Sequence, residues 1–232
     1  PSEMCIRDSS NTHSSLTVAK IPANRWTHLT HRRLQAIPST LTKSNTLLAS
    51  PLPNYLTHPI LERFEEYGIF AHTPHQQPNH VLVNEYRAGE GIMPHEDGDA
   101  YAAVVATVSL GAALCLDVLP LRSRDDVCGD GIEQGQDEEG YKLPTRIFQE
   151  PRSLLITTGR AYRELMHGIS SIEVDERLGE ESVANWSLLG DREGVLQKGG
   201  RNVRGTRVSL TYRDVLKVST AASRIFGGLV KK

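Results

Sequence analysis

The chain has 232 residues, enough for one domain with a substantial core but too few for a second domain of ordinary size. Hydrophobic residues make up 38% and charged residues 23% of the sequence, which is typical of a globular protein and not of a disordered one. The formal net charge of −2 argues against a nucleic-acid binder that depends on bulk positive charge, and leaves room only for a local basic groove.

The cysteine content and the length of the apolar runs indicate where in the cell the protein is located. The three cysteines form no CxxC pair, which argues against a disulfide framework, a disulfide-linked partner and a structural zinc site. The longest uncharged run, residues 100–116, is shorter than the roughly 20 apolar residues of a membrane span. We therefore expect no membrane association, and a location in the cytoplasm, the nucleus or both. Residues 1–15 are polar and patternless, and are interpreted as disordered or not native coding sequence.

Residues 16–78 are interpreted as an N-terminal extension. Within it, residues 26–34 fit neither helical nor strand periodicity, which predicts a surface loop or a short hairpin with a basic cluster that includes Arg32 and Arg33. Such a charge run is by default a solvated face. Pro59, an apolar stripe and Gly68 predict a helix that starts near Pro59 and is stopped by Gly68.

Short strands dominate residues 79–232. Apolar patterns predict strands over residues 80–87, 104–110, 113–119, 146–148, 153–157 and 206–212. Two polar stretches, residues 122–140 and 173–202, are interpreted as loop insertions. The sequence therefore predicts a mainly β fold, a sandwich or jelly roll, with a helical N-terminal extension packed outside it.

A candidate metal site comes from His95, Asp97 and His167. Residues two apart on an extended strand share a face, so His95 and Asp97 can point at one metal ion. Two imidazoles and a carboxylate leave three positions open on an octahedral Fe(II), which suits a bidentate 2-oxoacid and O2. The alternatives are that His95 and Asp97 form a surface hydrogen bond and that His167 is a partly buried structural histidine.

A candidate anion site comes from the predicted strand at residues 206–212 and the residue that follows it. Arg207 and Arg213 are six residues apart and share one face with Ser209 and Thr211, whereas Val208, Leu210 and Tyr212 form the other face. Buried arginines are costly unless paired, and a dicarboxylate such as 2-oxoglutarate is a fitting partner. The alternative is a solvated edge strand. On another strand, Asn84 and Tyr86 share a face and are candidates for the same pocket.

These motifs, taken in chain order, resemble the AlkB family of Fe(II)/2-oxoglutarate dioxygenases. The resemblance rests on Asn84-x-Tyr86, Gly89-x-Gly91, Pro94-His95-x-Asp97, Ser109-Leu110-Gly111, His167-Gly168-Ile169 and Arg207-x5-Arg213. It covers roughly residues 79–215, and residues 26–34 more loosely. It implies a double-stranded β-helix, a jelly roll, that uses Fe(II), 2-oxoglutarate and O2.

The resemblance also implies roles for single residues. His95, Asp97 and His167 become the iron ligands, and Arg207 pairs with the distal carboxylate of 2-oxoglutarate. Arg213 then lies near the metal-end carboxylate and Asp97, and Asn84 and Tyr86 complete the cosubstrate pocket. The N-terminal extension becomes a substrate lid, with Trp26, Arg32 and Arg33 near an incoming nucleotide. Position 209 is Ser where several family members carry Asn, which leaves the detail of the pocket open.

The activity implied is oxidative demethylation of alkylated nucleic-acid bases, with release of succinate, CO2 and formaldehyde. Two other functions stay open. The near-neutral charge is compatible with an oxygenase that acts on proteins. A jelly-roll binding module without turnover is the third, with the acidic residues 125–139 as its partner surface.

Overall fold

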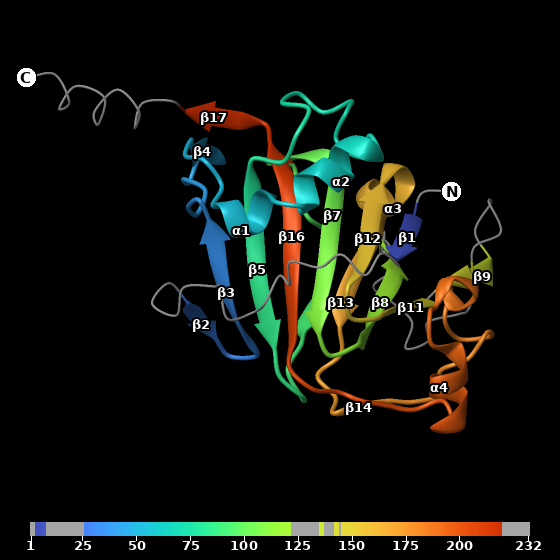
Figure 1. Ribbon diagram of the computed structural model, residues 1–232. Coiled ribbons are helices and arrows are strands. Elements are labelled where there is room, and N and C mark those ends of the chain that lie inside the picture. The colour runs from blue at the N-terminus through green and yellow to red at the C-terminus, as the bar shows by residue number, and fades with distance from the viewer. Residues whose placement is uncertain (1–2, 8–25, 122–134, 137–141, 144, 220–232) are drawn as a thin grey trace, which may run out of the picture.

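The fold is a sandwich of two antiparallel sheets, seen in a computed structural model that describes residues 3–7, 26–121, 135–136, 142–143 and 145–219 (Figure 1). The major sheet has the order β1-β12-β7-β16-β5-β3-β2. Its strands are β1 (Glu3–Arg7), β12 (Ser153–Thr158), β7 (Tyr101–Gly111), β16 (Arg207–Val215), β5 (His80–Tyr86), β3 (Arg32–Ile37) and β2 (Thr27–Leu29).

The minor sheet has the order β11-β8-β13-β6 and forms the second layer of the sandwich. Its strands are β11 (Thr145–Gln149), β8 (Leu114–Pro120), β13 (Leu165–Ile169) and β6 (Ile92–His95). Smaller pairs are β9 (Gly135–Gln136) with β10 (Lys142–Leu143), β14 (Val174–Asp175) with β15 (Asn202–Val203), and β17 (Lys217–Ser219) with β4 (Thr46–Leu48). This confirms the prediction of a mainly β jelly roll.

The outer face of the major sheet is covered by α1 (Asn54–Thr57) and α2 (Ile60–Glu66), which lie in front of β5, β16 and β7 in Figure 1. Apolar side chains from these strands and helices form the main core. Tyr212 of β16 packs edge-on against Phe64, with ring centroids 5.0 Å apart, and its hydroxyl donates to the Leu56 carbonyl over 2.8 Å. Gly68 has φ +62°, a conformation that favours glycine, and lies just beyond the end of α2 as predicted.

The predicted strands are confirmed with small shifts at their ends, because β7 begins at Tyr101 and β16 continues to Val215. Residues 26–34 form the hairpin alternative, since β2 pairs with β3. β3 then pairs with β5, so part of the N-terminal extension belongs to the major sheet. Among the described residues, no helix is long and apolar enough to span a membrane.

The second polar stretch, residues 173–202, is not the irregular loop that we expected. It contains β14, a 3-10 helix (Trp186–Leu188) and α4 (Arg192–Gln197), whose first turn is capped by Asp191 accepting from the Gly194 amide. Its apolar side chains form a second core with strands β8 and β11; the members are Cys115, Phe148, Leu178, Val183, Trp186, Leu189 and Val195. The other stretch, residues 122–140, lies outside the described residues except for 135–136.

Candidate active site

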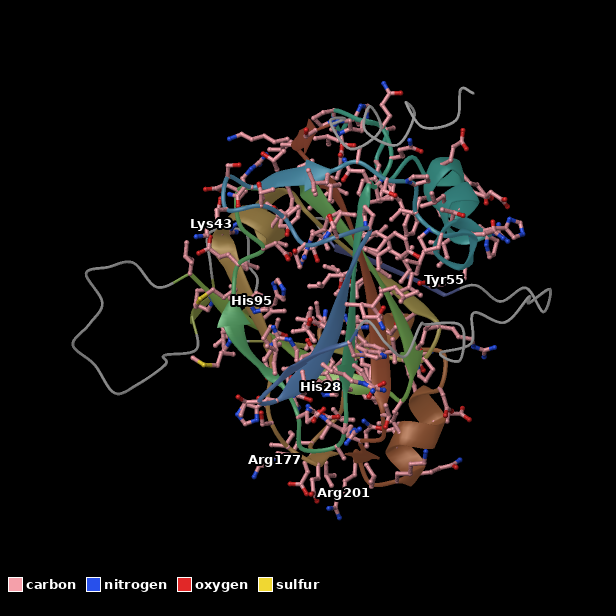
Figure 2. The ribbon with its side chains drawn as sticks, turned by 90° about the vertical axis from the view of Figure 1, so that its left-hand side faces the viewer. His28, Lys43, Tyr55, His95, Arg177 and Arg201 are labelled. Atoms are coloured by element: carbon pink, nitrogen blue, oxygen red, sulfur yellow. The ribbon has the colours of Figure 1, made fainter. Side chains whose placement is uncertain are left out.

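A cavity of about 260 Å³ lies between the two sheets. Inward-facing residues of β5, β7, β12 and β16 form one wall, and residues of β6, β8, β11 and β13 form the other. Figure 2 shows His95 directed toward this interior, whereas Tyr55 of α1 lies on the helix-covered side of the major sheet. The cavity therefore lies on the face of the major sheet that the helices leave open.

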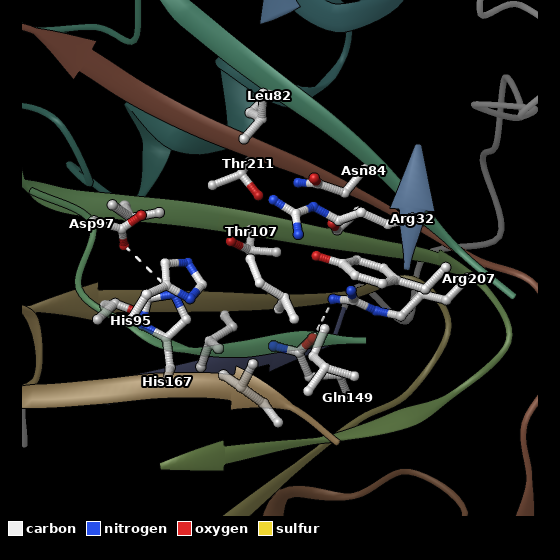
Figure 3. A pocket seen from close by; sticks show the side chains of 18 of the residues that line it. Arg32, Leu82, Asn84, His95, Asp97, Thr107, Gln149, His167, Arg207 and Thr211 are labelled. Carbon is white, nitrogen blue, oxygen red and sulfur yellow. Dashed lines mark hydrogen bonds and ion pairs between the residues drawn. The ribbon is translucent and has the colours of Figure 1, made fainter. Parts of the chain in front are cut away.

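At one end of the cavity, His95 and His167 face each other across the pairing of β6 with β13. Their ring centroids are 4.5 Å apart, and His167 Nε2 is 3.9 Å from Asp97 Oδ2 (Figure 3). β6 ends at His95, so Asp97 reaches the cavity from the following loop and not from the strand itself.

Local backbone features hold this end in place. A side chain at Gly168 would lie 2.9 Å from the Pro94 amide nitrogen, so glycine allows β13 and β6 to pair closely beside the two histidines. His95 Nδ1 is 2.9 Å from the Met93 carbonyl, which can only accept, so Nδ1 carries a proton and Nε2 is the ring nitrogen that could bind a metal. Tyr162 donates to the Gly98 carbonyl over 2.8 Å and fixes the loop that carries Asp97.

Arg213 controls the orientation of the Asp97 carboxylate. The Arg213 guanidinium donates to Asp97 Oδ1 and stacks 4.8 Å from the centre of the Tyr101 ring. In the described part of the chain, no three His, Cys, Asp or Glu side chains already form a closed metal-binding group. Metal binding at His95, Asp97 and His167 would therefore require these side chains to move toward a common centre.

The protonation of His167 suits a metal ligand. Burial lowers the pKa of its imidazole, and the nearby Asp97 carboxylate opposes that shift only in part. A lowered pKa keeps the ring neutral at physiological pH, and a neutral imidazole has a lone pair for a metal. The donor set, two imidazole nitrogens and a carboxylate oxygen, is the set that non-haem Fe(II) takes in oxygenases.

At the other end of the cavity lies Arg207, which is 2% exposed. Its Nη2 donates to Ser109 Oγ over 2.9 Å and to Gln149 Oε1, and its Nε has no partner. Burial lowers the pKa of Arg207 to about 10, so the group is still a cation at neutral pH. No carboxylate among the described residues pairs with it, which leaves a buried positive charge without a counter-ion.

Asn84 and Tyr86 stand beside Arg207 as predicted. The sheet register pairs Arg207 with Tyr86 and Ser209 with Asn84, and all four line the cavity. Burial raises the pKa of Tyr86, so its hydroxyl is a neutral donor at physiological pH. Asn84 Oδ1 is buried without a partner. Unpaired donors and acceptors at a buried cation are the mark of a site that completes its hydrogen bonds with a ligand.

The structure separates the three residues that were expected together near a nucleotide. Arg32 lines the cavity, whereas Arg33 points to the outer face, where it pairs with Glu85 over 2.7 Å. Trp26 packs on the outer core and lies 4.4 Å from the Arg33 guanidinium. Arg32 and Arg33 point to opposite faces because they are consecutive residues of a strand, and a place near an incoming nucleotide stays a prediction for all three residues.

Several polar residues of the cavity were missed as site residues, among them Gln149, Thr107 and Thr157. Gln149 is 1% exposed and holds Arg207, and Thr107 faces the cavity from β7. Neutral polar residues within strands carry no distinctive spacing signal. The available indication for Gln149 was its place in the alternating pattern of β11, where it follows Ile147 and Phe148 and shares a face with Ile147.

The fold and the site define a mononuclear iron oxygenase that uses a 2-oxoacid, and comparison with known proteins agrees. Residues 6–213 match the model of the 2OG-Fe(II) oxygenase superfamily, and the chain belongs to this family. Its cofactor and cosubstrates are accordingly Fe(II), 2-oxoglutarate and O2, and it is an oxidoreductase of the AlkB type.

Two relatives and one solved structure illustrate the similarity. The chain is 38% identical over 204 residues to the probable RNA/DNA demethylase ALKBH6 of Danio rerio, covering 88% of this chain and 80% of that protein. It is 28% identical to the tRNA (carboxymethyluridine(34)-5-O)-methyltransferase alkbh8 of Xenopus tropicalis, covering 72% of this chain and 22% of that protein. The solved structure of OsALKBH1 superposes with a TM-score of 0.44 and 17% identity, covering 79% of this chain and 78% of that one.

Proposed function

We propose that this enzyme oxidatively demethylates alkylated nucleic-acid bases, with Fe(II) held by His95, Asp97 and His167 and with 2-oxoglutarate anchored by Arg207. The observation that carries the proposal is that the two ends of the cavity differ in their side chains. Two histidines and an aspartate converge at one end, and a buried arginine without a counter-ion stands at the other. A short dicarboxylate has one group for each end.

The metal supplies the oxidation, because Fe(II) with 2-oxoglutarate activates O2 and couples formation of succinate and CO2 to hydroxylation of a C–H bond. The residues of the chain position the reactants. Arg207 binds the distal carboxylate through its planar guanidinium, and Tyr86 donates a further hydrogen bond. Arg213 keeps the Asp97 carboxylate at the metal end, and the Arg213 guanidinium is itself stacked on the Tyr101 ring.

The substrate class is proposed from the relatives and from product chemistry. The Danio rerio relative is named a probable RNA/DNA demethylase. Hydroxylation of an N-methyl group gives a carbinolamine, which breaks its C–N bond to release formaldehyde and the unmodified base. A base inside a duplex cannot reach a cavity of this size, so the target must be single-stranded or turned out of its stack.

The test is formaldehyde release from a panel of DNA and RNA oligonucleotides that carry single N-methylated bases. We expect at least one member to give formaldehyde and succinate in equal amounts, and neither product with the Arg207→Ala variant. If succinate forms from 2-oxoglutarate but no oligonucleotide yields formaldehyde, the iron and cosubstrate assignments stand and the nucleic-acid assignment fails. Incubation with cell-extract proteins, followed by mass spectrometry for oxidised residues, then tests the protein substrate.

A further inference from the structure

Arg32 is a charged residue of the cavity to which the proposed function gives no role. It begins β3, one residue before Arg33, whose partner on β5 is Glu85. This register places Arg32 beside Tyr86, on the inner face of the sheet. Figure 3 shows its guanidinium reaching into the cavity near Asn84, on the same side as Arg207.

Arg32 is partly buried and has no carboxylate partner among the described residues. Arg33 pairs with Glu85, Arg204 with Asp175 and Arg213 with Asp97. Among the described residues no carboxylate pairs with Arg32, and its Nε is buried without any hydrogen-bond acceptor. The two carboxylates that line the cavity, Glu96 and Asp97, belong to the metal end. Arg207 is in the same situation as Arg32.

Arg32 and Arg207 both act on Tyr86. Burial raises the pKa of the Tyr86 hydroxyl, and the positive charges of Arg207 and, next in size, Arg32 oppose that rise. Both cations are therefore close enough to the phenol to influence its ionisation. A carboxylate bound at this end of the cavity would therefore provide a counter-ion for both cations.

We propose that Arg32 is a second binding residue for the distal carboxylate of 2-oxoglutarate, which it shares with Arg207 and the Tyr86 hydroxyl. The inference rests on the proposed position of the cosubstrate at Arg207. It moves Arg32 from the substrate lid to the cosubstrate pocket. It also links the β2–β3 hairpin to the cosubstrate, because the carboxylate then joins β3 to β16.

The test measures 2-oxoglutarate binding to the full chain by calorimetry, with Mn(II) in place of Fe(II) to prevent turnover. Arg32→Ala removes one charged hydrogen-bonding group, so its Kd for 2-oxoglutarate should be higher than that of the wild type on the order of 10- to 100-fold. Arg32→Lys keeps the charge but loses the fork geometry, so its Kd should fall between those of Arg32→Ala and the wild type. Arg87→Ala removes an exposed arginine from the same end of β5, and its Kd should equal that of the wild type.

A second ligand makes the test specific for the distal carboxylate. 2-Oxopentanoate has the same carbon chain and lacks that group, so Arg32→Ala should not change its affinity. The inference is overturned if Arg32→Ala binds 2-oxoglutarate as the wild type does, or if it weakens both ligands equally. Thermal unfolding without ligand identifies a variant that has lost its fold, and Arg32→Lys then decides.

The two assignments fail separately. If Arg207→Ala weakens 2-oxoglutarate and Arg32→Ala does not, the proposed site stands and Arg32 is not part of it. A loss of affinity for single-stranded oligonucleotide in that Arg32→Ala variant would then assign its guanidinium to the phosphates of the substrate. If neither variant weakens 2-oxoglutarate, the position of the cosubstrate itself is wrong.

Discussion

The two faces of the major sheet carry different tasks on the same strands. On β16, Val208, Leu210 and Tyr212 face the helices and form part of the main core. The residues between and around them face the cavity, and they are Arg207, Ser209, Thr211 and Arg213. Because successive side chains of a strand point to opposite faces, the face that a residue occupies decides whether it stabilises the fold or lines the site.

The same rule operates on β3 over a distance of one residue. Arg33 contributes to the outer face through Glu85 and Trp26, whereas Arg32 enters the cavity. Substitutions of the inner-face residues that line the cavity should therefore change ligand binding and leave the free energy of unfolding almost unchanged. Those on the outer face should do the reverse.

The largest effect is expected from His167→Ala at the metal end of the inner face. Loss of one of three proposed ligands should abolish Fe(II)-dependent formation of succinate, because two donors do not hold the ion in place. The measurement is succinate formation together with the iron content of the purified protein. His28→Ala, in an exposed strand of the hairpin, is the matched control and should be fully active. Equal activity of the two variants would remove His167 from the site.

Next in size is the contrast between neighbours on β16. Leu210→Ala should lower the free energy of unfolding by about 2–5 kcal/mol, because Leu210 is 1% exposed and its removal leaves a cavity in the main core. Ser209→Ala should change it by less than about 1 kcal/mol. Urea unfolding of both variants measures the difference. Similar losses would show that the inner face also carries the stability of the sheet.

A smaller effect is expected when the pH is lowered, because the free energy of unfolding should then fall through protonation of His80, which lies at the end of the inner face. Burial lowers the pKa of His80 to about 4, with a contribution from Arg213, so the folded protein resists protonation that the unfolded chain accepts near 6.5. Stability from the neutral ring is complete above pH 6.5 and is lost as the pH falls toward 4. Between pH 7.5 and 5 the loss should be about 2 kcal/mol.

The control for this pH effect is His80→Gln, which cannot titrate. The difference in unfolding free energy between pH 7.5 and 5 should be smaller in His80→Gln than in the wild type by that amount. Urea unfolding at the two pH values provides the numbers. Identical pH dependence in both proteins would mean that His80 has the same pKa in the folded and unfolded states.

Much of the fold and the centre of the site could be predicted from the sequence, because both depend on local periodicity. Alternation on β5 and β16 placed Asn84, Tyr86, Arg207 and Arg213 on one face, and the structure agrees. The hydrophobic runs gave β5, β7, β12 and β16 of the major sheet and β8 and β11 of the minor sheet, but not β13 (Leu165–Ile169). These patterns are short-range properties of an extended chain, so one sequence contains them.

The parts that could not be predicted depend on contacts between distant segments. Residues 173–202 appeared polar because their apolar side chains are spread over short, irregular elements, and only β8 and β11 complete that core. The orientation of the hairpin was equally hidden, since the pairing of β3 with β5 decides that Arg32 faces inward and Arg33 outward. Gln149 reaches Arg207 only through the packing of one sheet on the other.

The central claim is that one cavity on the inner face binds iron at the histidine end and 2-oxoglutarate at the Arg207 end. The most direct measurement is an anaerobic absorption titration of the purified protein with Fe(II) and then 2-oxoglutarate, beside Arg207→Ala. We predict a weak visible charge-transfer band that requires both additions and that needs much more 2-oxoglutarate in the variant. A folded wild-type protein without the band, or a variant that titrates like the wild type, would contradict the account.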